Sequence, residues 1–270
     1  MKKLLTLVTF LFSFISTAQF LQSRLLKVEQ KNMEKFMSAV ANKTKLYNSK
    51  EGQPRYITFQ ILTGPEAQNF VRMQYAPKVE DFDKIDKVGN AYWQKTTGAL
   101  HQSVGSRIWY RNVDASYTPE EMSRVNHRRI LYYKIKPGMG KDFWRYRTRL
   151  VKALKAAEWP QRVSTLNCAS GCDGNWVQVR YHHKNFAGEA SDNSNFSKVV
   201  EKYNEMYGED SYEDDSQKLQ MSVIENRTRH HQRLPELSSP WNSKISFNFK
   251  KTLQFEGFFI SFLIIRLISC

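Results

Sequence analysis

The feature that most constrains the fold of this chain is an internal repeat. A shift of about 107 residues brings similar residues into register along two successive stretches of the sequence. The matched positions are Leu26-Lys27-Val28 with Tyr133-Lys134-Ile135, Phe36 with Phe143, Gly64 with Gly171, Asn69-Phe70-Val71 with Asn175-Trp176-Val177, and Tyr75 with Tyr181. Because their order and spacing hold throughout, we predict that one structural unit occurs twice.

Both copies show the same order of periodic segments. A strand and an amphipathic helix are followed by two strands that face each other across a glycine turn, then by a second helix and a final strand. In the first copy the expected elements are strand 25–30, helix 33–47, strands 56–62 and 69–75, helix 79–100 and strand 107–113. In the second copy they are strand 130–136, helix 143–154, strands 163–168 and 175–182, helix 195–207 and strand 219–226. The order is βαββαβ.

This element order determines how the two copies should pack. A four-stranded antiparallel sheet with helices on one face leaves its other face bare, and a second copy can cover it. We therefore expect an α+β fold in which two tandem ferredoxin-like βαββαβ units form an intramolecular dimeric α/β barrel. The expected boundaries are 19–113 for the first unit, 114–129 for a linker and 130–230 for the second unit.

The βαββαβ order over residues 22–230 resembles the ferredoxin-like dimeric α/β-barrel superfamily, which includes antibiotic-biosynthesis-monooxygenase-like domains. The resemblance extends to the fold and carries no diagnostic motif. It implies a site between a sheet and its helices. It also raises the haem-degrading and cofactor-free oxygenases of that superfamily as a hypothesis for function.

The ends of the chain differ in composition from the repeats. Lys2 and Lys3 precede an apolar run that ends in small residues, Ser16 to Ala18, which is the pattern of a cleaved secretory signal peptide. We predict that residues 1–18 direct export to the periplasm or the extracellular space. Residues 231–270 are expected to form an atypical tail, which becomes rich in Phe, Ile and Leu from Ser239 onward and is either disordered or lies at a membrane interface.

The cysteine positions are consistent with export. Cys168 and Cys172 flank the turn between two predicted strands, so a disulfide between them is plausible in an oxidising compartment. Since the closed loop is short, such a bond would pin the turn and contribute little to the stability of the whole fold.

The charge balance excludes a dedicated nucleic-acid-binding arm. The net charge of +15 is distributed over both repeats and both ends. We therefore expect no specific nucleic-acid partner, although weak contact with anionic membranes or polysaccharides remains open. One basic helix face, Lys141, Arg145, Arg149 and Lys152, is interpreted as solvated in preference to membrane-binding. The acidic run 209–215 could offset its charge, and we expect that run to be a flexible connection.

Three residues are candidates for a ligand site in the sheet, namely Asn69, Trp176 and His182. The alternative for Asn69 is a turn asparagine, and for Trp176 a core aromatic residue.

The six histidines invite a metal hypothesis, because His182-His183 and His230-His231 form two adjacent pairs. We expect the pairs to lie far apart, on strand ends at opposite edges of the sheet, and we expect no metal. His101 and His127 are expected to be solvated.

No short catalytic or cofactor motif occurs in the sequence. It contains no Walker loop, dinucleotide glycine fingerprint, nucleophile elbow, zincin helix or paired-cysteine zinc site, so we predict no cofactor, and catalytic residues stay unassigned. The favoured hypothesis is an exported noncatalytic envelope protein that binds a small apolar or anionic ligand. The alternatives are a cofactor-free or haem-binding monooxygenase-like enzyme and a salt-sensitive binder of anionic surface polymers.

Overall fold

The computed structural model describes residues 19–240, which contain eight strands and six α-helices. The strands are β1 (Phe20–Lys27), β2 (Arg55–Ile61), β3 (Phe70–Ala76), β4 (Gln102–Tyr117), β5 (His127–Ile135), β6 (Val163–Ser170), β7 (Asn175–His183) and β8 (Val223–Arg233). The helices are α1 (Met33–Tyr47), α2 (Lys87–Thr97), α3 (Gly140–Ala156), α4 (Phe186–Ser194), α5 (Ser197–Tyr207) and α6 (Ser211–Met221).

The eight strands form one closed barrel in the order β1-β3-β2-β8-β5-β7-β6-β4. All neighbouring strands are antiparallel, and β4 closes the barrel by pairing with β1. Two seams join strands from the two halves of the chain. At one seam β2 pairs with β8, and at the other β4 pairs with β6. The α+β class is therefore confirmed, and the closed barrel is consistent with a dimeric α/β barrel.

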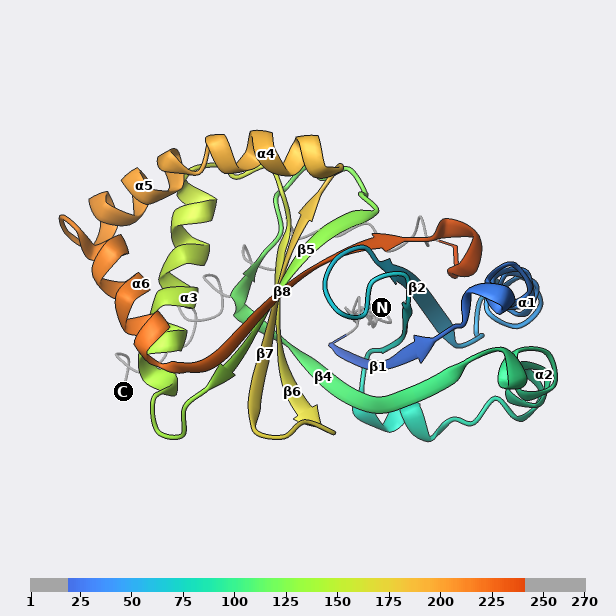
Figure 1. Cartoon of the computed structure of the whole chain (residues 1–270). Coiled ribbons are helices and arrows are strands. Elements are labelled where there is room, and N and C mark those ends of the chain that lie inside the picture. Colours follow the sequence, from blue (N-terminus) through green and yellow to red (C-terminus); the bar gives the residue numbers. More distant parts are fainter. Residues whose placement is uncertain (1–18, 241–270) are drawn as a thin grey trace, which may run out of the picture. The chain divides into compact units, whose positions relative to one another are not determined.

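The helices cover the outside of the barrel in two groups (Figure 1). Helices α1 and α2 lie beside the strands of the first half, and α3 to α6 lie beside those of the second half. Successive residues of a strand point to opposite faces, so each strand contributes one row of side chains to the helices and one row to the barrel interior.

Three clusters of buried apolar side chains result from this arrangement. Phe36 and Phe70 belong to the cluster under α1, and Phe143 and Val179 belong to the cluster under α3. The third cluster fills the barrel interior, and its buried members are Leu21, Phe59, Met73, Trp109, Leu166 and Trp176. The bare sheet faces thus cover each other inside the barrel.

The second half differs from the predicted pattern between β7 and β8. One helix was predicted at 195–207, with a flexible connection at 209–215, but the structure has three helices there. The prediction for the acidic run was wrong because Asp215 is buried in α6, where Arg145 Nε donates to Oδ1 at 2.9 Å and Arg149 Nη1 donates to Oδ2 at 2.8 Å. Two residues of the basic α3 face therefore bind α6. The last strand also lies later than the predicted 219–226.

The segment after β8 returns to the first half of the chain. A short 3-10 helix at Pro235–Leu237 buries Leu237 in the cluster under α1. The backbone N–H of Ser239 donates to the carbonyl of Tyr56 at 2.7 Å. Residues 234–239 are therefore part of the packed fold, although they fall in the predicted tail.

Several predictions concern residues at the ends of the chain. The predicted signal peptide, 1–18, and the predicted tail from residue 241 onward lie outside the described residues. Within residues 19–240, no helix has the length and apolar character required to cross a membrane.

A disulfide joins Cys168 and Cys172, whose Cα atoms are 6.4 Å apart. It closes the turn between β6 and β7, where Gly171 adopts a φ of 81°.

Candidate functional site

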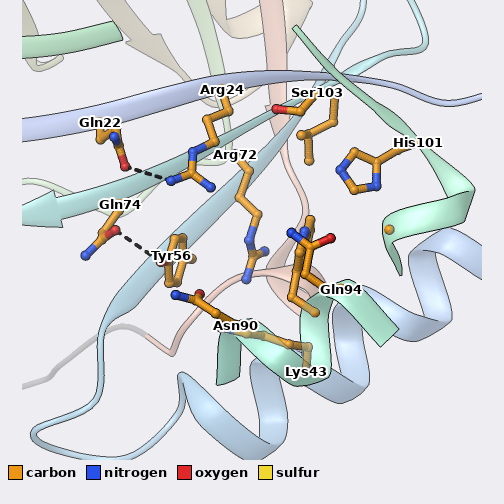
Figure 2. A pocket seen from close by; sticks show the side chains of 13 residues that line it. Gln22, Arg24, Lys43, Tyr56, Arg72, Gln74, Asn90, Gln94, His101 and Ser103 are labelled. Atoms are coloured by element: carbon orange, nitrogen blue, oxygen red, sulfur yellow. Dashed lines mark hydrogen bonds between the residues drawn. The ribbon is translucent and has the colours of Figure 1, made fainter. Parts of the chain in front are cut away.

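A polar cleft lies between the first-half strands and helices α1 and α2, with a volume of about 260 Å³. We call it the cationic cleft. Its lining combines basic side chains (Arg24, Lys43, Arg72), uncharged polar side chains (Gln22, Gln74, Asn90, Gln94, Ser103) and rings (Tyr56, Trp93, His101). Figure 2 shows that these side chains come from the sheet on one side and from the helices on the other.

Strand register brings the sheet side of this cleft together. Arg24 on β1 is opposite Arg72 on β3, and Gln22 is opposite Gln74. Tyr56 on β2 is in turn opposite Gln74, and its hydroxyl donates to Gln74 Oε1 at 3.1 Å. Because these residues occupy matching positions, their side chains share the face that the helices cover.

Arg72 is buried at the base of the cationic cleft, with an exposed fraction of 6%. Its guanidinium donates only to uncharged oxygens. The acceptors are Thr58 Oγ1 at 2.7 Å, the Leu237 carbonyl at 3.0 Å, Thr44 Oγ1 at 3.3 Å and Asn48 Oδ1 at 3.5 Å. Burial lowers the pKa of Arg72 to about 10. The group therefore stays charged at neutral pH without a carboxylate partner among the described residues.

Lys43 supplies a second buried cation from α1. Its Nζ donates to Asn48 Oδ1 at 2.7 Å, and its side chain is almost fully buried. Burial and the charge of the neighbouring Arg72 together lower the pKa of Lys43 to about 8, although the Asp86 carboxylate acts in the opposite direction. Within the described residues Lys43 forms no ion pair, so a sizeable fraction of it is uncharged at slightly alkaline pH.

Aromatic rings complete the wall of the cleft. The Tyr56 ring centroid is 4.8 Å from Lys43 Nζ and 4.7 Å from Arg72 Cζ, and Arg72 also lies 5.2 Å from the Trp93 ring. The His101 ring packs at 5.3 Å from Trp93. His101 was predicted to be solvated, but it lies against the cleft because the short connection from α2 to β4 turns it back onto Trp93.

This arrangement of charges favours an anionic ligand. Buried charges in proteins are usually paired, because an isolated buried ion loses its hydration without compensation. Arg72 and Lys43 contact only neutral acceptors, and no Asp or Glu lines the cationic cleft in the described part of the chain. A carboxylate or phosphate in the cleft would supply the missing negative charge, and the rings would contact an attached apolar group.

Sequence reasoning missed Lys43 and Arg72. A signal for Lys43 does exist, since it follows Phe36 and Val40 at helical spacing and thus falls within the apolar stripe of α1. A charged residue inside an apolar stripe indicates a buried charge, and such charges gather at functional sites.

A larger cleft of about 830 Å³ lies between the second-half strands and helices α3, α4 and α6. We call it the second-half cleft. His183 lines it, and its Nδ1 lies 2.6 Å from Asp192 Oδ2. Arg147 is fully buried there and donates to the Tyr181 hydroxyl at 3.1 Å, while its Nε and Nη2 have no hydrogen-bond partner. This cleft therefore also presents an unpaired cation.

The three residues suggested as ligand-binding from the sequence lie outside both clefts. Asn69 accepts from the Val28 backbone N–H at 3.2 Å and donates to Glu66 at 3.1 Å. Trp176 lies in the barrel interior, where its Nε1 donates to Asp173 Oδ1 at 2.8 Å. His182 is half-buried, and its position on β7 is opposite Arg128 on β5. The structure does not bring the three together, and a binding role for them stays a prediction.

The expectation that the two histidine pairs lie far apart was wrong. Strand β5 lies between β7 and β8, which run parallel to each other, so both pairs lie at the same edge of the sheet. Arg128 on β5 is opposite His182 on one side and His231 on the other. His127, predicted to be solvated, is only 2% exposed because α4 covers this edge.

Comparison with known proteins reveals similarity at the level of fold. No family model and no curated protein matches the sequence. A proposed monooxygenase from Lactobacillus acidophilus has a TM-score of 0.57 at 7% identity, with 83% of this chain and 96% of that chain covered. A proposed monooxygenase from Fusobacterium nucleatum has a TM-score of 0.54 at 11% identity, covering 81% and 93%. A chlorite dismutase from Candidatus Nitrospira defluvii, in complex with imidazole, has a TM-score of 0.52 at 10% identity, covering 82% and 93%.

These similarities show the fold of the chain. The chain has the fold of dimeric α/β-barrel proteins that are named as monooxygenases and chlorite dismutases. The favoured hypothesis of an exported noncatalytic envelope protein is corrected by this finding, because the solved structures that share the fold are named as enzymes.

Proposed function

We propose that the protein is a monooxygenase-like enzyme whose substrate is a small organic anion bound in the cationic cleft. The observation that carries this proposal is the pair of buried cations, Lys43 and Arg72, with no carboxylate partner among the described residues. The volume of about 260 Å³ suits a molecule with one aromatic ring and a carboxylate. The fold shared with proposed monooxygenases supports the choice of reaction class.

Each group in the cationic cleft has a role in this reaction. Arg72 and Arg24 bind the carboxylate of the substrate, and Tyr56 and Trp93 pack against its ring. Uncharged Lys43 removes a proton from an activated CH2 group, since a general base works best when its pKa is close to the working pH. The resulting carbanion gives up electrons to dioxygen. The CH2 group becomes C=O, and the second oxygen atom leaves as water with the two hydrogens of that group, so the reaction needs no further reductant.

The binding part of the proposal can be tested by calorimetry with 4-hydroxyphenylpyruvate, which carries a carboxylate, a ring and an acidic CH2 group. We expect it to bind, and we expect its neutral analogue 4-hydroxyphenylacetone to bind about tenfold more weakly or worse, because the analogue leaves both cations unpaired. At pH 7, below its pKa of about 8, Lys43 is mostly charged, and Lys43→Met should weaken binding of the acid by a similar factor. Lys45→Met is the matched control, because Lys45 is exposed on the same helix. Equal binding of acid and ketone would refute the proposed site.

The catalytic part can be tested with an oxygen electrode on the same compound. Oxygen uptake should rise with pH up to about 8, following deprotonation of Lys43, and Lys43→Met should abolish that rise while Lys45→Met preserves it. Binding without any enzyme-dependent oxygen uptake would overturn the enzymatic assignment for this substrate class and leave only anion binding.

A second candidate function is haem binding in the second-half cleft. The residues there fit the group, because His183 is backed by the Asp192 carboxylate in the way that metal-ligating imidazoles usually are. His183 would hold the iron, and the unpaired N–H groups of Arg147 would hold a propionate. A bound haem would supply iron-based oxidation chemistry. The chain itself would orient the imidazole through Asp192 and bury the propionate against Arg147.

Titration with hemin tests this second candidate. A Soret band that saturates at one haem per chain is expected, and His183→Ala should shift or remove it. His182→Ala is the control, because neighbouring strand residues point to opposite faces of the sheet. If the spectrum of free hemin persists, or if both variants behave alike, this candidate is rejected.

We also propose that the barrel consists of two tandem ferredoxin-like units, 19–113 and 130–230, joined by 114–129. The matching strand orders β4-β1-β3-β2 and β8-β5-β7-β6 support this division. Export is a further part of the proposal. The Cys168–Cys172 disulfide supports it, since disulfides persist in oxidising compartments. N-terminal sequencing of the protein from its native host tests export, because an uncleaved Met1 would count against it.

A further inference from the structure

Three potential metal ligands meet on the outer face of the barrel beside α4. They are His127 at the start of β5, His230 near the end of β8 and Glu189 on α4. Glu189 Oε2 lies 3.6 Å from His127 Nε2 and 3.2 Å from His230 Nε2. One ligand atom from each residue lies within 4.8 Å of the other two. We call these three residues the His127–Glu189–His230 cluster.

Two atoms of this cluster are buried without hydrogen bonds. His127 is 2% exposed and Glu189 is 7% exposed, yet His127 Nε2 and Glu189 Oε2 have no hydrogen-bond partner. An unsatisfied buried imidazole nitrogen costs free energy unless another group binds it.

Surrounding residues hold two of the ligands in place. Arg129 Nη1 donates to Glu189 Oε1 at 3.2 Å, an oxygen that also lies 3.4 Å from His230 Nε2, while Oε2 faces both imidazoles. Thr63 Oγ1 lies 3.2 Å from His230 Nδ1, on the opposite side of that ring from Nε2. Such contacts fix the orientation of metal ligands in many proteins.

Phe186 shields the cluster from solvent. Its ring centroid lies 4.5 Å from that of His127 and 5.0 Å from that of His230. The two imidazole rings are themselves nearly parallel, with an interplanar angle of 23°. The cluster is therefore a defined, mostly buried arrangement, and only His230 is partly accessible, with 18% of its side chain exposed.

We propose that His127, Glu189 and His230 form a binding site for a divalent transition metal of the zinc type. Two imidazoles and one carboxylate are a ligand set that zinc uses with a water molecule in the fourth position. The distances fit, because ligand atoms about 2.0 to 2.2 Å from zinc are roughly 3.3 Å from one another in a tetrahedral site. The three ligand atoms already lie within 4.8 Å of one another, so metal binding would draw the two imidazoles closer together.

The charge at the site selects this class of ion. Arg129 compensates the single carboxylate, so the cluster has no excess negative charge. Calcium and magnesium bind mainly to several oxygen ligands and would gain little here, whereas zinc and its neighbours in the first transition row bind well to imidazole. The site lies outside the cationic cleft, so it stands independently of the proposed function.

The test is a cobalt titration of the protein, prepared without a polyhistidine tag and stripped with a chelator. One Co²⁺ per chain should bind and give the visible d–d absorption of a low-coordinate site, and Zn²⁺ should displace it. Glu189→Gln should weaken Co²⁺ and Zn²⁺ binding by about tenfold or more. Glu213→Gln is the matched control, because Glu213 is exposed on α6.

Two further measurements exclude a trivial loss of structure. Far-UV circular dichroism of Glu189→Gln checks that the variant folds, and His230→Asn removes a ligand at the most accessible position. If both variants bind Co²⁺ as the native protein does, or if the native protein shows no d–d absorption with excess Co²⁺, the proposal is overturned. In that case the cluster is a hydrogen-bonded structural contact between α4 and the sheet.

Discussion

Lys43 and Arg72 donate to the same oxygen atom, Oδ1 of Asn48, at 2.7 and 3.5 Å. Two like charges are thus held together under α1 by a neutral amide. The arrangement opposes stability in the absence of an anion, because burial and the charge of Arg72 both lower the pKa of Lys43. Buried charges that destabilise the protein before a ligand binds are common in ligand-binding clefts.

The pH dependence of stability should reveal the lowered pKa of Lys43. Its pKa is about 8 in the folded state and 10.5 as the ordinary value, so between these pH values the unfolded chain binds more protons than the folded one. Stability should therefore rise with pH across this window, by no more than about 3 kcal/mol. Urea unfolding at pH 7 and pH 10 should show this gain in the native protein and in Lys45→Met, but not in Lys43→Met. Equal gains in all three proteins would contradict the buried charge.

The order of strands and helices could be predicted from local pattern, and most of it is confirmed. Alternating apolar residues, helical spacing and the turn glycines Gly64 and Gly171 are local signals, and each repeat supports the other. The pairing at the seams β2–β8 and β4–β6 could not be predicted from local pattern, because residues such as Phe59 and Arg233 pair although they lie far apart in the sequence.

Helices α4 and α6 and the His127–Glu189–His230 cluster were missed for a related reason. Helix α4 carries few apolar residues, so its spacing predicted no helix, and Glu189 was not a candidate. The histidines were noticed but were placed at opposite edges, because the strand that separates β7 from β8 was not considered. Lys43 shows the opposite case, since its signal was present in the apolar stripe of α1 and was not used.

Asp215 should be the main polar support of the second-half helices. Burial raises the pKa of its carboxyl, but hydrogen bonds from Tyr203, Arg149 and Arg145 outweigh burial and keep the pKa below its ordinary value of 3.8. The stability it provides is present above that value and is lost as the pH falls through the folded-state pKa. Asp215→Asn should destabilise the protein by about 3 kcal/mol at pH 7, since it leaves Arg149 with no charged partner and Arg145 with Asp142 alone.

Thermal unfolding measures this effect, with Asp214→Asn as control because Asp214 is an exposed neighbour. The difference between native protein and Asp215→Asn should shrink as the pH is lowered below 3.8. A difference that does not depend on pH would show that packing, and not the charge, accounts for the loss.

Leu237 should anchor the returning C-terminal segment. Its side chain is fully buried, and its carbonyl accepts hydrogen bonds from Thr58 at 3.0 Å and from Arg72 at 3.0 Å. Leu237→Ala should cost about 2 to 5 kcal/mol in urea unfolding, as for other buried leucines. Glu236→Ala, an exposed neighbour, should change stability by less than about 0.5 kcal/mol. A small effect of Leu237→Ala would show that residues 234–239 do not stabilise the first half.

The stability of the turn between β6 and β7 should depend more on Gly171 than on the Cys168–Cys172 disulfide. Gly171 has a φ of 81°, and a Cβ there would lie 2.3 Å from the Ser106 carbonyl oxygen on β4. The clash falls beside the β4–β6 seam, where Ile108 pairs with Ser170. Gly52 has the same φ, but a Cβ there meets nothing within 4 Å. Gly52→Ala therefore measures the conformational cost alone, about 1 kcal/mol.

Gly171→Ala should cost at least about 2 kcal/mol more than Gly52→Ala, because backbone atoms on β4 cannot move aside as a flexible side chain could. Reduction of the disulfide should cost about 2 kcal/mol, the chain-entropy value for so short a loop. Hydrogen exchange should show where Gly171→Ala destabilises the barrel. The β4 and β6 amides should exchange faster than in the native protein, and exchange at the β2–β8 seam should be unchanged. Uniformly faster exchange would instead mean that the two seams open together, as a single cooperative unit.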